Sequence, residues 1–205
     1  MTDYFALLDA PRRPWLDPDR VQEKFLKLSA QAHPDRAHGA SEPEKEKANQ
    51  RFSELNAASN CLREPAKRLL HLLELETGAR PKELQQIAPD AMEFFLKVGQ
   101  LCREVDAFLA QRNRVTAPVL KVEMFERAQE WIQKVNQLQS VLAARREALE
   151  TELKQLDAGW DRAPAAGPTR AHALPLAAIE RLWRDFSYLA KWSAQLQERV
   201  AQLSF

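Results

Sequence analysis

The segment from Ala117 to Leu156 places the strongest constraint on what this chain can fold into. Its apolar residues recur at intervals of three and four. This seam comprises Phe125, Ala128, Ile132, Val135, Leu138 and Leu142, and it is extended by Leu149, Leu153 and Leu156. Such spacing aligns apolar side chains along one side of a long helix, as in a coiled coil. The pattern therefore predicts a helix that packs against other helices.

The composition favours helices elsewhere in the chain as well. The 205 residues include only five glycines, and long segments are rich in Leu, Ala, Glu, Gln, Lys and Arg, all good helix formers. Hydrophobic residues make up 45% of the chain, which is enough to bury a core. We therefore expect an all-α protein with one large domain or two small ones.

The N-terminal part is predicted to consist of short helices. Asp17 can cap free backbone amides, and Pro18 at the first helical position loses no hydrogen bond, so a helix should begin there. Ser41 and Glu44 have the spacing of a capping box, which predicts the start of the next helix. The predicted helices cover residues 1–8, 18–32, 42–62 and 66–76.

A boundary is predicted between residues 78 and 89, where Gly78, Pro81 and Pro89 interrupt the helical pattern. Three longer helices follow, at about 90–113, 117–156 and 175–203. The short connection between the first two favours antiparallel neighbours. We therefore expect an N-terminal domain at 1–77, a linker at 78–89 and a C-terminal antiparallel three-helix bundle at 90–205.

Several classes of protein are disfavoured by the same sequence. It has no run of about 18 apolar residues, which a membrane-spanning helix needs, and its start does not resemble a signal peptide. Basic residues are not clustered and the net charge is +1, so we expect no nucleic-acid partner. Cys61 and Cys102 lie within helical patterns, where each is expected to be a small buried hydrophobe. A cytoplasmic protein of a reducing compartment, without a metal or cofactor, fits best.

The tripeptide His33-Pro34-Asp35 lies between two predicted helices and is the main candidate for a functional site. Pro34 stiffens the connection and should hold His33 and Asp35 exposed in one geometry. The Asp35 carboxylate could then accept charge-assisted hydrogen bonds from an arginine of a partner. The basic residues nearby, which suit an acidic partner face, are Lys24, Lys27 and Arg36.

Other interpretations of this tripeptide are a catalytic site, a metal site and a simple turn. His33 could act as a general base oriented by Asp35, but no nucleophile elbow or Gly-rich phosphate loop accompanies it. His33 and His38 could share a metal, but no acidic or thiol pair joins them at ligand spacing. We therefore expect an interaction site, and a protein that is not an enzyme.

Residues 3–76 resemble a J-domain. The resemblance rests on His33-Pro34-Asp35 between two helices, with Asp3-Tyr4-Phe5, Leu7 and Leu8 upstream and Asn56-Ala57-Ala58 downstream. The whole chain resembles the HscB type of J-protein, also called Hsc20 or Jac, the co-chaperone of iron–sulfur cluster assembly. The stretches that carry this narrower match are Pro11; Leu62, Pro65, Arg68 and Leu72-Leu73; Leu156-Asp157 with Trp160-Asp161; and Phe186, Leu189 and Leu196.

The resemblance implies two binding surfaces. A DnaK/HscA-class chaperone would bind the second helix and the tripeptide, through Lys24, Lys27, His33, Pro34, Asp35 and Arg36. An IscU-like iron–sulfur scaffold would bind the bundle, through Met92, Phe95, Leu96, Gly99, Trp183 and Phe186. Phe94, Phe95 and Leu96 are consecutive, so they cannot all face one core, and at least one of them should be exposed.

The chain also departs from the family pattern. Ala32 stands where an aromatic residue is common, Gln22 and Gln31 stand where many J-domains carry basic residues, and Gly99 stands where a larger apolar residue is usual. Residues 163–175 resemble an insertion, and residues 159–174 are expected to form a mobile loop. Two alternatives therefore stay open: a J-protein that serves another client, and a helical interaction protein that does not stimulate a chaperone.

Overall fold

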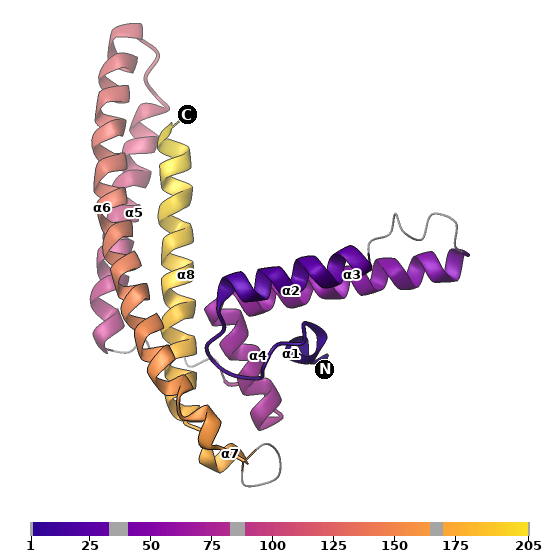
Figure 1. The fold of residues 1–205 in the computed structure, drawn as a ribbon. Coiled ribbons are helices and arrows are strands. Elements are labelled where there is room, and N and C mark those ends of the chain that lie inside the picture. Colours follow the sequence, from indigo (N-terminus) through magenta and orange to yellow (C-terminus); the bar gives the residue numbers. More distant parts are fainter. Residues whose placement is uncertain (1, 33–40, 83–88, 165–169, 205) are drawn as a thin grey trace. The chain divides into compact units, whose positions relative to one another are not determined.

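The computed structural model describes residues 2–32, 41–82, 89–164 and 170–204, and every regular element within them is helical (Figure 1). The all-α prediction is thereby confirmed. The helices are α1 (Tyr4–Leu7), α2 (Pro18–Gln31), α3 (Glu42–Arg63), α4 (Pro65–Thr77), α5 (Pro89–Arg112), α6 (Pro118–Asp157), the 3-10 helix η2 (Trp160–Arg162), α7 (Arg170–Ala173) and α8 (Leu176–Ser204).

The chain divides into two compact units, and two of its helices contribute to both. The first unit comprises Met1–Lys82 and Thr151–Arg184, and the second comprises Glu83–Glu150 and Asp185–Phe205. The first unit therefore holds α1 to α4, the last residues of α6, η2, α7 and the start of α8. The division predicted from the sequence, at 1–77, 78–89 and 90–205, stays a prediction.

Helices α2 and α3 lie side by side in the first unit and begin at the caps that the sequence predicts (Figure 1). The Asp17 carboxylate accepts a hydrogen bond from the backbone N–H of Asp19, with Pro18 in the first turn. At the start of α3, the backbone N–H of Ser41 donates to Glu44 Oε2 at 2.9 Å, which completes the capping box. The core between these helices and their neighbours includes Phe5, Leu8, Val21, Leu55, Leu62, Leu69 and Leu72.

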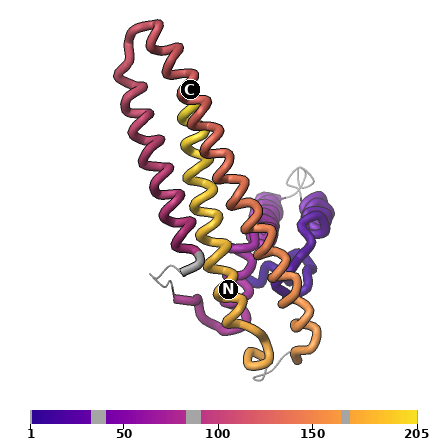
Figure 2. Tube along the Cα trace, turned by 90° about the vertical axis from the view of Figure 1, so that its left-hand side faces the viewer, coloured from indigo at the N-terminus to yellow at the C-terminus, as the bar shows by residue number. Residues whose placement is uncertain are grey.

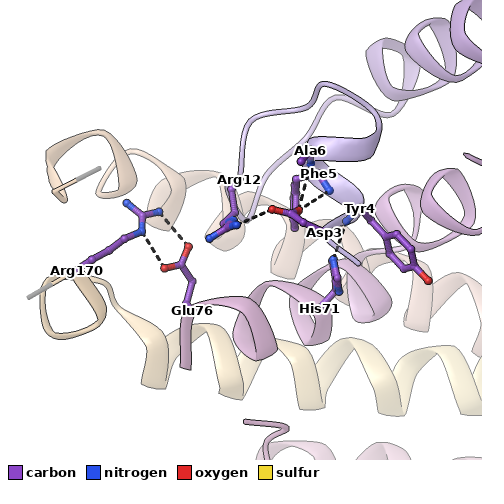
Figure 3. Close-up of polar contacts among 8 residues, drawn as sticks. All are labelled: Asp3, Tyr4, Phe5, Ala6, Arg12, His71, Glu76 and Arg170. Carbon is purple, nitrogen blue, oxygen red and sulfur yellow. Dashed lines mark hydrogen bonds and ion pairs between the residues drawn. The ribbon is translucent and has the colours of Figure 1, made fainter. Parts of the chain in front are cut away.

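Helix α1 is fixed to α4 by polar contacts at its first residues (Figure 3). Asp3 Oδ1 accepts hydrogen bonds from the backbone N–H groups of Phe5 and Ala6, while Asp3 Oδ2 pairs with Arg12 at 2.5 Å. Burial raises the pKa of the Asp3 carboxyl, but the hydrogen bonds from Arg12 and the two amides outweigh burial and lower that pKa below its usual value. The backbone N–H of Tyr4 donates to Nε2 of the buried His71 at 3.1 Å.

The second unit is a bundle in which α5, the first part of α6 and the last part of α8 lie side by side (Figures 1 and 2). Successive helices run in opposite directions, as the short connection between α5 and α6 predicts. The side chains buried at its centre include Val98, Val105, Ala128, Val135, Leu142 and Leu196. At one end, Arg112 donates to the backbone carbonyls of Gln202 and Leu203, which joins the end of α5 to the end of α8.

Two details of the sequence prediction were wrong. Phe125 was assigned to the seam of α6, but it is 62% exposed, and Met124 is buried in its place, one turn before the buried Ala128. Residues 159–174 were expected to be a mobile loop, but η2 and α7 form there. Trp160 of η2 is buried, and Arg170 of α7 makes a two-bond ion pair with Glu76 at 2.8 and 3.1 Å (Figure 3).

Candidate functional site

The chaperone-facing residues predicted from the sequence fall partly on α2 and partly outside the described residues. His33, Pro34, Asp35 and Arg36 belong to residues 33–40, which the structure does not describe. Lys24 and Lys27 lie on α2, immediately before that segment. Of this predicted surface, the structure therefore describes only the part that lies on α2.

The two lysines of α2 have different environments. The Lys24 ammonium group donates to the backbone carbonyl of Asp9 and lies 3.3 Å from the Asp9 carboxylate, so it is held against the turn after α1. Lys27 is exposed and makes no hydrogen bond or ion pair with any residue that the structure describes. Lys27 is thus the lysine whose charge is available to a partner, whereas Lys24 serves mainly to position α2.

Leu26 is a surface residue that the sequence argument missed. It lies between the two lysines and is 55% exposed, although the other large apolar residues of α2 are buried or half-buried. Its position could have been found from the sequence, because it lies one residue away from the apolar stripe of Val21, Phe25 and Leu28. The free face of α2 therefore offers an apolar side chain beside a cation.

An open cleft of about 390 Å³ borders α2, but its charges are internally paired. Arg13 Nε donates to Asp157 Oδ1 at 3.0 Å, and the backbone N–H of Trp15 donates to the same oxygen at 3.1 Å. Hydrogen bonding to the Asp157 carboxylate raises the pKa of the Arg13 guanidinium above its usual value, against the effect of burial. This arrangement anchors the α1–α2 connection to the end of α6 within the first unit.

The predicted client-binding residues of α5 form an exposed apolar stripe. Met92, Phe95 and Leu96 are 39%, 45% and 60% exposed, so the expectation that part of this segment faces solvent is confirmed. Their neighbour Phe94 turns the other way and is half-buried against Trp192 of α8, with ring centroids 6.3 Å apart. Gly99 continues the stripe one turn further along α5.

The two residues predicted on α8 have a different character. Trp183 is 7% exposed and Phe186 is 2% exposed, so both are core residues in this structure. Their contribution to partner binding stays a prediction, and the surface defined by the structure consists of Met92, Phe95, Leu96 and Gly99. We call this set the α5 stripe.

The two cysteines are free and lie in different environments. Cys102 is buried, Cys61 is half-buried and neither forms a disulfide. Burial raises the pKa of the Cys61 thiol to about 11, which keeps it protonated and unreactive at neutral pH. Among the described residues, no three His, Cys, Asp or Glu side chains are grouped to hold a metal ion, and no helix is long and apolar enough to cross a membrane.

Comparison with known proteins matches residues 3–71 to the DnaJ domain family. The chain is 32% identical over 100 residues to the protein called co-chaperone protein HscB homolog of Mannheimia succiniciproducens, covering 49% of this chain and 57% of that protein. It is 34% identical over 74 residues to co-chaperone protein HscB of Proteus mirabilis, covering 36% of this chain and 43% of that protein. The matched region thus spans about half the length of these curated relatives.

The fold is similar to solved structures over nearly the whole chain. Chaperone HscB from Vibrio cholerae superposes with a TM-score of 0.57 at 21% identity, covering 98% of this chain and 99% of that one. Human co-chaperone protein HscB gives the same TM-score at 16% identity, covering 98% and 81% of the two chains. At these identities the likeness establishes a shared fold.

Residues 3–71, which include α2 and α3, therefore match the J-domain family. The sequence relatives and the solved structures reported above are HscB proteins, and the helical fold that this chain shares with those structures extends beyond the J-domain.

Proposed function

We propose that this protein is a co-chaperone of iron–sulfur cluster assembly. It stimulates the ATPase of a DnaK/HscA-class chaperone through its J-domain, and it delivers an IscU-like scaffold bound to the α5 stripe. The observation that carries the proposal is the coexistence of two features in one chain: a J-domain with an intact His33-Pro34-Asp35 sequence, and an exposed apolar stripe on a separate helix.

The mechanism is allosteric coupling, without covalent chemistry by this chain. The J-domain binds the ATP-bound chaperone more tightly than its other states, and that difference in affinity biases the chaperone toward hydrolysis. Lys27 on the free face of α2 supports the encounter, since exposed charges mainly raise association rates and fix orientation. The exposed Leu26 beside it offers an apolar contact. His33 and Asp35 make the contacts that couple binding to hydrolysis.

The α5 stripe explains how client and chaperone are brought together. Exposed apolar side chains on consecutive turns of one helix are typical of a protein-binding surface. Because one chain carries both surfaces, the second binding event is intramolecular, and its effective concentration is raised. A modest affinity at each surface is then sufficient for delivery.

The J-domain part of the proposal is tested by single-turnover ATP hydrolysis by a DnaK-class chaperone from the same cell. The wild-type protein should accelerate hydrolysis, and His33→Gln should abolish the acceleration while leaving the circular dichroism spectrum and the thermal midpoint unchanged. Lys27→Glu should weaken the acceleration, and the matched charge reversal Arg63→Glu at the far end of α3 should not. Folded wild-type protein without any effect would refute the proposal for that chaperone.

A J-protein that serves a different client is the second candidate. Gly99 favours it, because a glycine as the last member of the α5 stripe removes apolar area that a client could contact. Stimulation of the chaperone without binding of the IscU-like scaffold would select this alternative. Folded protein without stimulation would instead favour a helical interaction protein.

A further inference from the structure

The α5 stripe does not end at Gly99 but continues to a cation. Leu96, Gly99 and Arg103 follow one another at intervals of three and four residues, so they share a face of the helix with Met92. Arg103 Nη1 lies 3.6 Å from the position that a Cβ atom on Gly99 would occupy. The Arg103 guanidinium therefore lies back along the helix over Gly99, on the same face as the apolar residues.

Arg103 has no counterion within the described residues, and two nearby cations, Lys97 and Arg199, are already paired with other acids. It makes no hydrogen bond or ion pair with any of those residues. Lys97, on the same helix, pairs with Glu93, with 2.6 Å between Lys97 Nζ and Glu93 Oε1. On the side toward α8, Arg199 pairs with Asp106 at 3.0 Å. The neighbouring Glu104 accepts a hydrogen bond from Gln100 at 2.9 Å. Within the part of the chain that the structure describes, the stripe thus combines an apolar surface with the positive charge of Arg103, which no ion pair compensates.

The chemistry of this combination defines what it can bind. A guanidinium group is planar and presents several N–H donors in a fixed fork, which matches the two oxygens of a carboxylate. An ion pair gains strength when a partner covers it and excludes water, and the apolar side chains beside Arg103 provide such a setting. An acidic group placed next to an apolar side chain on the partner would fit both parts of the surface.

We propose that Arg103 is a specificity-determining residue of the α5 stripe, which selects a client surface that places a carboxylate beside its apolar contact residues. The inference rests on the proposed function, because it takes the IscU-like scaffold as the occupant. The inference adds that the client surface carries a negative charge, which the apolar residues of the α5 stripe alone do not define.

The test is a calorimetric titration of the IscU-like scaffold from the same cell into the full-length protein and its variants. Arg103→Glu should weaken binding about tenfold, because a like charge would then face the client carboxylate. Arg103→Lys should weaken binding less than Arg103→Glu does, because lysine keeps the positive charge but lacks the planar fork of donors. Arg114→Glu, the same charge reversal beyond the end of α5, is the matched control and should leave the affinity unchanged.

Salt dependence gives a second readout that a structural role of Arg103 would not change. Wild-type affinity should fall as ionic strength rises, whereas that of Arg103→Glu should rise, because screening weakens attraction in one case and repulsion in the other. Leu96→Ala separates the two proposals. If Leu96→Ala weakens binding and Arg103→Glu does not, the charge inference is wrong and the proposed function stands. If the scaffold does not bind the folded wild-type protein, both are refuted.

Discussion

Arg13 and Asp157, 144 residues apart in the sequence, form a bonded pair in the first unit, with Arg13 Nε donating to Asp157 Oδ1 at 3.0 Å. A second Arg13 nitrogen lies 2.5 Å from Asp157 Oδ2, and the Trp15 backbone N–H shares the carboxylate. The pair joins the connection between α1 and α2 to the last residue of α6. The N-terminal helices of this chain are therefore stabilised by residues from its C-terminal half.

Loss of this pair should destabilise the protein substantially. Arg13→Ala would leave the buried Asp157 carboxylate without its cation, and we expect a loss of about 3 kcal/mol in the free energy of unfolding. Asp161→Ala, which removes the exposed second acid at 3.4 Å from Arg13, should cost less than about 0.5 kcal/mol. Urea denaturation followed by circular dichroism measures both. Equal effects of the two changes would contradict the assigned role of Asp157.

Stability should fall as the pH is lowered through the range in which histidine titrates. His71 accepts a hydrogen bond from Tyr4, and burial lowers its pKa, although the carboxylates of Asp3 and Glu74 act in the opposite direction and Arg12 acts with burial. The unfolded chain therefore takes up the proton first. The contribution of neutral His71 is fully present above the unfolded pKa of about 6.5, and it is lost progressively as the pH falls from there toward the lower folded pKa.

The pH effect is measured by urea titrations between pH 5 and pH 8 of the wild type and of His71→Gln. The part of the stability loss that arises from His71 should disappear in this variant. The control is His172→Gln, which removes an exposed histidine and should keep the wild-type pH profile. A His71→Gln profile identical to that of wild type would show that this histidine does not contribute.

Substitution by alanine should change the stability of the protein in opposite directions at two of its glycines. Gly99 lies inside α5, and a Cβ atom there would make only an ordinary contact with Arg103, so Gly99→Ala should stabilise the protein by about 1 kcal/mol. Gly78 ends α4 with a φ of 71°, where an L side chain is strained, so Gly78→Ala should destabilise it by about 1 kcal/mol. Thermal unfolding of both variants checks the pair. Destabilisation by Gly99→Ala would indicate a packing constraint at that position.

A buried and an exposed phenylalanine should differ in how much their replacement by alanine destabilises the protein. Phe186→Ala should reduce the free energy of unfolding by about 3 to 5 kcal/mol, because this side chain is almost fully buried. Phe95→Ala should cost less than about 1 kcal/mol, because the side chain is nearly half exposed, yet it should weaken scaffold binding. Denaturation and calorimetric titration of the same two samples separate stability from binding. Comparable stability losses would contradict the exposure of Phe95.

Local features of this fold could be predicted from the sequence. The caps at Asp17 and at Ser41 with Glu44 depend on hydrogen bonds between residues two or three positions apart, and the structure confirms both. Exposure within the segment 94–96 followed from helical geometry, since three consecutive apolar residues cannot face one core.

Features that depend on distant partners could not be predicted in this way. Arg170 with Glu76 orders α7 inside a segment whose composition suggests a loop, and the two residues are 94 positions apart. Arg103 is one of many arginines in the sequence, and only the structure reveals that it is exposed over Gly99 and has no counterion among the described residues. Trp183 and Phe186 were assigned to a partner surface because the family resemblance implies it, while the structure buries both.

The most direct test of the account is whether one chain couples the two binding events. Single-turnover ATP hydrolysis by the DnaK-class chaperone would be measured with wild-type protein and with Leu96→Ala, each with and without the IscU-like scaffold. The scaffold should enhance stimulation by the wild type, whereas Leu96→Ala should keep the basal stimulation and lose the enhancement. Equal stimulation with and without scaffold for the wild-type protein would contradict the proposed delivery of a scaffold by the α5 stripe.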